Sequence, residues 1–157
     1  MMQARIQGIA TTNRISSAAA IAAVLLGLGA GGAIAADANG TWLTESGKAT
    51  VRIAPCADAL CGTIVALKEP NDPETGRPRT DKNNADPSQR NRPVIGSLIV
   101  LGMKPNGANK WSGQVYNAED GKTYTGAITL QGANALKLEG CILGGLICKA
   151  QTWTRGG

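Results

Sequence analysis

Short runs of alternating apolar and polar residues, separated by glycine, asparagine, aspartate and proline, extend from about residue 40 to the end of the chain. Val51 and Ile53, for example, alternate with Thr50 and Arg52. A period of two is typical of strands with one buried and one exposed face, and no window here has a helical period of useful length. The predicted strands are Thr41–Thr44, Ala49–Ala54, Gly62–Lys68, Val94–Met103, Lys110–Asn117, Lys122–Leu130, Ala135–Cys141 and Ile147–Arg155.

The connections between these strands are mostly short. Asn106-Gly107, Asp120-Gly121 and Gly144-Gly145 are typical turns of β-hairpins. Strands joined in this way pair antiparallel with their sequence neighbours, and a sheet of about eight of them has exposed edges that closure removes. The sequence therefore predicts an all-β fold, an up-and-down antiparallel barrel of about eight strands, with an open sandwich as the alternative.

The first 35 residues have the pattern of an export signal. Arg5 and Arg14 give a positively charged start, Ala18–Ala30 is apolar, and Ala33-Ile34-Ala35 has the form of a cleavage site. We expect cleavage to leave a single domain, residues 36–157, that is periplasmic or secreted and has no stable membrane span. An uncleaved anchor is the alternative, because the apolar stretch could just cross a bilayer, which takes roughly 20 residues.

Charge and residue usage exclude several classes of function. Without Arg5 and Arg14, 14 basic residues face 11 acidic ones, so the formal net charge falls from +5 to +3. A small and scattered basic excess does not predict nucleic-acid binding. The chain has no histidine, so Ser-His-Asp and Cys-His hydrolases and histidine-ligated metal sites lose their usual base or ligand. We expect no cofactor and no metal.

The four cysteines are Cys56, Cys61, Cys141 and Cys148. Four cysteines allow three pairings, and an oxidising compartment favours disulfides. We favour the local pairs 56–61 and 141–148, the second of which would close a hairpin around Gly144-Gly145. A redox-active pair and a zinc site are the alternatives, and both fit the spacing and the compartment less well.

The long connection 69–93 differs from the others, because it carries five acidic and five basic residues. Connections of this length are usually either functional lids or mobile excursions, and we expect this one to border any site. Guanidinium groups suit carboxylate or phosphate oxygens, but Asp81 and Asp86 are near enough in sequence to pair with them internally. The arginines concerned are Arg77, Arg79, Arg90 and Arg92.

Trp42 lies at the start of the first predicted strand and Arg155 at the end of the last. Closure of the barrel would bring these two strands together. An arginine laid over an indole face gains roughly 0.5–2 kcal/mol of cation–π energy. We expect this pair to close one end of the barrel and to leave the other end as the mouth.

An ordered set of short motifs extends over nearly all of the chain after the leader. Its first half consists of Cys56 with Leu60-Cys61-Gly62, Asp81 with Asn83 and Asn84, Arg90-Asn91-Arg92-Pro93 before Gly96, and Trp111-Ser112-Gly113. Its second half consists of Tyr116, Asp120-Gly121-Lys122-Thr123-Tyr124, Gly140-Cys141, Leu143-Gly144, Cys148 and Gln151-Thr152-Trp153-Thr154-Arg155. This set resembles the exported bacterial proteins grouped as domain of unknown function 2147.

The resemblance implies a lipocalin-like, or calycin, β-barrel, in agreement with the strand count. Gly40-x-Trp42 and Arg155 likewise resemble the signature of calycin barrels. Ala85 and Ala118 depart from the pattern, since proline is expected at both positions. The resemblance brings no activity with it.

Three functions are compatible with the sequence. The leading hypothesis is a non-catalytic barrel that binds a small apolar or amphipathic ligand at its open end, beneath the long loop. The alternative is a cell-envelope interaction or structural module that contacts a protein or a cell-wall component, with Tyr116 and Tyr124 as candidate contacts. The third is a carboxylate-based enzyme. Its candidate residues are Asp81 or Asp86, Arg90 or Arg92, and Tyr124.

Overall fold

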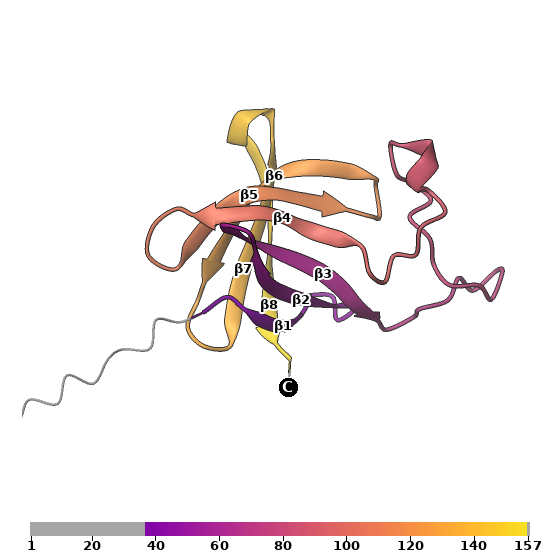
Figure 1. Ribbon diagram of the computed structural model, residues 1–157, viewed down its shortest axis with the longest axis horizontal. Coiled ribbons are helices and arrows are strands. Elements are labelled where there is room, and N and C mark those ends of the chain that lie inside the picture. Colours follow the sequence, from indigo (N-terminus) through magenta and orange to yellow (C-terminus); the bar gives the residue numbers. More distant parts are fainter. Residues whose placement is uncertain (1–36, 157) are drawn as a thin grey trace, which may run out of the picture. The chain divides into compact units, whose positions relative to one another are not determined.

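The computed structural model describes residues 37–156, so the leader predicted for residues 1–35 lies outside the described residues. Eight strands form a closed antiparallel barrel in which each strand pairs with the next and β8 returns to β1 (Figure 1). The elements are β1 (Gly40–Leu43), β2 (Ala49–Cys56), β3 (Ala59–Leu67), η1 (Pro87–Gln89), β4 (Leu98–Pro105), β5 (Lys110–Asn117), β6 (Lys122–Leu130), β7 (Ala135–Ile142), η2 (Leu143–Gly145) and β8 (Ile147–Arg155).

The predicted up-and-down barrel is confirmed, and the open sandwich is excluded by pairing between β1 and β8. The main error concerns the strand predicted for Val94–Met103, which begins at Leu98 instead. Residues 94–97 form a turn, in which the Ser97 amide donates to the Val94 carbonyl at 3.1 Å and Gly96 has a φ of +93°. The apolar Val94 and Ile95 suggested a strand, although they are the first two residues of this turn.

Side chains from the strands fill the inside of the barrel. Buried apolar side chains on the inner face include Trp42, Val51, Leu60, Val100, Ile128, Leu136 and Trp153, and Val115 of β5 packs against them. Glycines let the wall approach these side chains: a Cβ on Gly62 would lie 2.8 Å from Val100, and one on Gly126 would lie 2.5 Å from Val115. Since close-packed protein cores leave few voids larger than a water molecule, these side chains leave little room for a ligand inside the barrel.

Consecutive connections alternate between the two ends of an up-and-down barrel. The β2–β3, β4–β5 and β6–β7 turns share one end, which we call the floor. The β1–β2 turn, the long β3–β4 loop and the β5–β6 and β7–β8 turns share the other, which we call the mouth (Figure 1). The expected pairs are both present, and each disulfide closes a hairpin turn: Cys56–Cys61 at the floor and Cys141–Cys148 at the mouth.

Arg155 holds the floor together. Its guanidinium lies 4.2 Å from the ring centre of the buried Trp42, and it donates to the backbone carbonyls of Ala133, Asn39 and Asp37 at 2.6–2.8 Å. Gly40 lies directly beneath it, where a Cβ would be 2.5 Å from the guanidinium. The arginine thus links the start of the barrel, its last strand and the β6–β7 turn.

We predict that Arg155→Met lowers the free energy of unfolding by roughly 2–4 kcal/mol, because it removes charged hydrogen bonds to three carbonyls together with the cation–π contact. Urea titration of the oxidised protein, followed by tryptophan fluorescence, measures the loss. Arg52→Met is the matched control, since Arg52 is exposed on β2. Equal losses for the two variants would contradict a closing role for Arg155.

Candidate functional site

The long loop at the mouth has a definite internal structure. Two isolated bridges, Asn71 with Pro78 and Thr80 with Pro93, fold it into a pair of narrow arms. The first arm ends in a turn where the Asp72 carboxylate accepts from the amides of residues 74 and 75. The second arm carries η1, whose first turn is capped by the Asp86 side chain through the amide and hydroxyl of Ser88. The loop is therefore an ordered part of the mouth.

A buried cluster fastens the second arm to the barrel. Asp81, which has no exposed surface, accepts from the Tyr116 hydroxyl at 2.6 Å and from the Asn84 amide at 2.7 Å. Arg92 donates to the same carboxylate through Nε at 2.9 Å and Nη2 at 2.7 Å, and its guanidinium lies 5.5 Å from the Tyr116 ring centre. We call Asp81, Asn84, Arg92 and Tyr116 the Asp81 cluster.

Electrostatics keep this carboxylate charged. Burial disfavours the ionised form of Asp81, but the hydrogen bonds from Tyr116, Asn84 and Arg92 and the positive charge of Arg92 outweigh burial and hold its pKa below the usual value. Burial, the hydrogen bond to Asp81 and the charge of Asp81 raise the pKa of Tyr116. At neutral pH the cluster thus contains a paired carboxylate, a guanidinium and a neutral phenol.

The loop also contacts the β5–β6 turn. The Asn83 amide donates to the backbone carbonyl of Glu119 at 2.8 Å. Gly121 in this turn has a φ of +71°, and a Cβ there would lie 1.7 Å from the Asn83 carbonyl oxygen. Glycine is therefore needed at this position both for its backbone conformation and for the close approach of the loop.

The two tyrosines named as candidate contacts have different surroundings. Tyr116 is opposite Thr123 and Tyr124 is opposite Val115, so the two rings leave the hairpin on opposite faces. Tyr116 is buried under the loop and is not available to a partner. Tyr124 is half-buried and donates to the Asp120 carboxylate. That hydrogen bond raises the pKa of Tyr124. In Asp120 burial is the largest single influence, but the hydrogen bonds from Tyr124, Lys122 and Asn117 and the charge of Lys122 together outweigh it and lower the pKa.

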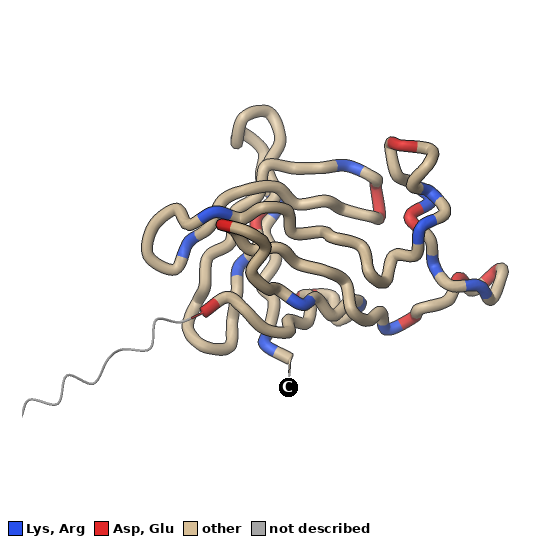
Figure 2. The backbone as a smooth tube through the Cα atoms, in the orientation of Figure 1, with Lys and Arg blue, Asp and Glu red and all other residues tan. Residues whose placement is uncertain are grey.

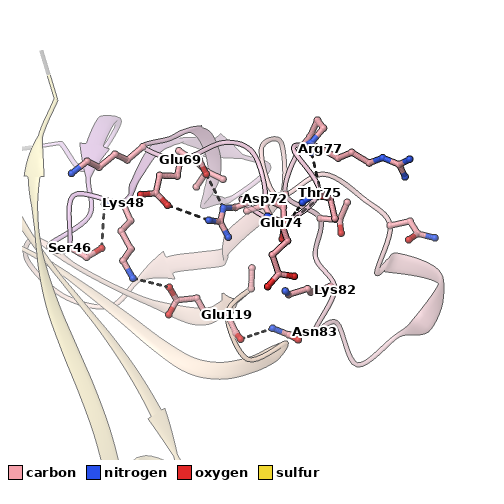
Figure 3. Close-up of a pocket in the computed structure, with 18 residues that line it drawn as sticks. Ser46, Lys48, Glu69, Asp72, Glu74, Thr75, Arg77, Lys82, Asn83 and Glu119 are labelled. Carbon is pink, nitrogen blue, oxygen red and sulfur yellow. Dashed lines mark hydrogen bonds and ion pairs between the residues drawn. The ribbon is translucent and has the colours of Figure 1, made fainter.

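A cleft of about 900 Å³ lies at the mouth between the long loop and the neighbouring turns (Figure 3). Its base includes Leu67, Val94 and Ala118, which pack against the core. Glu74 and Lys82 face it from the loop, opposite Lys48 and Glu119 on the turns. We call this space the mouth cleft. Its size is within the range of small-molecule sites, roughly 300–1,000 Å³.

The walls of the mouth cleft are charged and partly paired. Lys48 lies 3.8 Å from Glu119, and Arg79 lies 3.4 Å from Glu69. Among residues 37–156, Lys68, Arg77 and Lys82 have no ion-pair partner. The lining includes five basic residues, Lys48, Lys68, Arg77, Arg79 and Lys82, and four acidic ones, Glu69, Asp72, Glu74 and Glu119. An apolar base below charged walls suits a ligand with an apolar part and a polar part.

The structure separates the residues that the sequence grouped. Arg77 and Arg79 line the mouth cleft, whereas Asp81 and Arg92 are in the buried cluster. Arg90 donates to the Asn84 carbonyl at 2.8 Å, and Asp86 caps η1. Asp81, Asp86 and Tyr124 thus have separate partners and form no shared centre. Sequence reasoning did not assign the cleft residues Lys48, Leu67, Glu74, Lys82, Val94 and Glu119, which come from three different connections and adjoining strand ends.

The part of the chain that the structure describes contains no group of three or more cysteine, aspartate or glutamate side chains placed to hold a metal ion. It also contains no helix of the length and apolar character needed to cross a membrane.

Comparison with solved structures supports the fold. The chain is similar to HP1028 from the human pathogen Helicobacter pylori, a protein described as belonging to the lipocalin family. The TM-score is 0.65 at 22% sequence identity, and the similarity covers 77% of this chain and 84% of the other. An identity this low shows a shared lipocalin-like barrel and no more. No curated protein matches the chain.

Comparison with family models identifies the group. The model described as "Uncharacterized protein conserved in bacteria (DUF2147)" matches residues 40–155. The match extends from the first residue of β1 to the last residue of β8. It confirms the resemblance noted from the motifs, and the chain belongs to the DUF2147 family.

Proposed function

We propose that the protein is an exported, non-catalytic barrel that holds a small amphipathic ligand in the mouth cleft. The observation that carries this proposal is the cleft itself, with about 900 Å³ of space, an apolar base and charged walls. The packed interior favours the cleft over the inside of the barrel as the ligand's place. Leu67, Val94 and Ala118 would contact the apolar part of the ligand.

The charged part of the ligand would meet the walls. Three basic residues of the lining, Lys68, Arg77 and Lys82, lack ion-pair partners among the described residues, against two acidic ones, Asp72 and Glu74, so a single anionic group is favoured over a cationic one. The acidic side chains in the same walls would select against ligands with more than a small negative charge. A ligand with an apolar body and one anionic group fits both features.

Export is part of the proposal. Two disulfides in 120 described residues suit an oxidising compartment, and the family is bacterial. We infer that residues 1–35 form a cleaved signal peptide and that the mature protein is periplasmic or secreted.

The geometry of Asp81 supports a structural role for this residue over a catalytic one. Both of its carboxylate oxygens accept hydrogen bonds from neighbouring side chains, and none of its surface is exposed. A catalytic carboxylate has to reach a substrate and to exchange a proton near the working pH. A buried carboxylate with a lowered pKa does neither, so we infer that the Asp81 cluster positions the loop.

We predict that Asp81→Asn destabilises the protein at pH 7 by about 2 kcal/mol and loosens the loop, because it leaves the Arg92 charge without its partner. The pKa of Asp81 is lower in the folded state than the unfolded value of about 3.9. Its stabilising effect is therefore present above about pH 4 and is lost as the pH falls through the folded pKa. The difference in the free energy of unfolding between wild type and variant should therefore shrink as the pH falls below about 4.

Urea titrations at several pH values and limited trypsin digestion measure the two effects. Faster cleavage after Arg79 or Lys82 would report a loosened loop. Asp58→Asn is the control, since Asp58 is exposed at the floor and its pKa is also lowered, chiefly by a hydrogen bond from Lys104. A stability difference that stays constant with pH, or unchanged cleavage of the loop, would contradict the role assigned to Asp81.

We predict that native mass spectrometry of protein purified gently from periplasm, without reductant, shows an adduct of a few hundred daltons on a chain that begins near Ala36. Ala118→Glu should remove this adduct, because it places a charged side chain on the apolar base of the cleft. Ala108→Glu, in an exposed turn at the floor, should retain it. A bare wild-type mass, or an adduct unaffected by Ala118→Glu, would refute binding in the mouth cleft.

A further inference from the structure

The tip of the β7–β8 hairpin is an exposed apolar surface that the proposed function does not use. The tip runs from Ile142 to Ile147 and contains two isoleucines, two leucines and two glycines. The exposed fractions are 43% for Ile142, 68% for Leu143, 84% for Leu146 and 53% for Ile147. No charged residue occurs in this tip (Figure 2). Four large aliphatic side chains are thus held in water at one point of the surface.

The hairpin carries this tip beyond the body of the barrel. Residues 147–152 of β8 are all exposed, although alternate strand residues elsewhere in the barrel are buried. Figure 1 shows the end of the hairpin rising clear of the neighbouring strands. The tip therefore projects at the mouth end as a convex point, and its exposed side chains have no neighbouring surface to pack against in the described part of the chain.

The tip is also held in one shape. The disulfide joins Cys141 and Cys148, which are opposite each other at the base of the tip. Leu143 has a φ of +52° and is followed by Gly144 at +66° and Gly145 at +96°. Leucine rarely adopts such a backbone conformation, and a glycine or asparagine would suit the turn better. This position thus has a large apolar side chain where turn geometry alone would favour a small or polar one.

The charges near the tip favour an anionic partner. From Gly140 to Thr154, the part of the chain that forms the tip and the strand segments beside it, the one charged residue is Lys149. Lys149 follows the disulfide directly and is exposed. The chain after residue 35 has a formal net charge of +3, since 14 basic residues face 11 acidic ones. A lysine beside an apolar tip is suited to reach lipid phosphates while the aliphatic groups lie deeper.

The size and shape of the tip favour a lipid surface over a protein. Four side chains make a patch of a few hundred Å², on the order of the largest patches of soluble monomers. A stable protein interface buries about 800 Å² on each partner, which is more than this patch provides. A convex point also needs a matching hollow in a protein partner, whereas lipid chains rearrange around it.

We propose that the β7–β8 tip inserts into the headgroup region of an anionic phospholipid bilayer and attaches the protein to the membrane surface. Ile142, Leu143, Leu146 and Ile147 enter the boundary between headgroups and acyl chains, and Lys149 contacts phosphate. The attachment is peripheral and reversible, because one small tip buries far less apolar surface than a spanning segment. It does not depend on a ligand in the mouth cleft.

Flotation with vesicles of phosphatidylethanolamine and phosphatidylglycerol tests the proposal, using oxidised protein that begins at Ala36. Wild type should float with these vesicles and bind phosphatidylcholine vesicles less. Leu143→Asp combined with Leu146→Asp should weaken binding roughly 30-fold or more, since each leucine loses its transfer from water and adds a charge. Lys149→Glu should weaken binding to the anionic vesicles alone.

The matched control is Val65→Asp combined with Leu98→Asp. Val65 and Leu98 are 43% and 45% exposed on the outer wall of β3 and β4, away from the tip, and this pair should leave binding unchanged. Thermal unfolding of all variants checks that they are folded. Wild type that stays with the buffer, or equal losses for both double variants, would overturn the proposal. Sedimentation showing a wild-type dimer that Leu143→Asp with Leu146→Asp dissociates would assign the tip to a second copy instead.

Discussion

Closure between β1 and β8 is the constraint on which the rest of the barrel depends. The two strands pair at two positions, Trp42 with Arg155 and Leu43 with Thr154. Without this seam the sheet would have two open edges, and the apolar side chains of the core would lose their enclosure. The shortest strand of the barrel thus forms half of its closing contact.

Side chains supplement the backbone pairing along this seam. β1 ends at Leu43, and the Glu45 carboxylate accepts from the Thr152 amide at 2.6 Å at the point where the strand has ended. At the other end Arg155 binds three carbonyls, and the Gly156 amide donates to Thr41. The hydrogen bonds of Glu45, Arg155 and Gly156 therefore extend the seam beyond the two paired positions.

The sequence predicted the wall of the barrel much better than its mouth. Strands were predictable because alternation and turn residues act locally, and the cysteine pairs were predictable because each closes one hairpin. The error at Val94 arose because an apolar run does not reveal whether it continues a strand or leads into a turn. The charges of the loop indicated internal pairing of Asp81 and Asp86 with nearby arginines, but they did not assign Arg92 to Asp81. The contact between Asp81 and Tyr116 crosses 35 residues and depends on which face of β5 the tyrosine occupies. The mouth cleft, formed by connections far apart in the chain, has no counterpart in any local pattern.

The positions of the two described ends have a practical consequence. Arg155 binds the carbonyl of Asp37, and the Gly156 amide is bonded to Thr41, so both ends lie at the floor, away from the mouth. A fusion partner or an affinity tag joined at either end would leave the four mouth connections unobstructed. Protein immobilised on a sensor through such a tag would present its mouth to the solution in a uniform orientation.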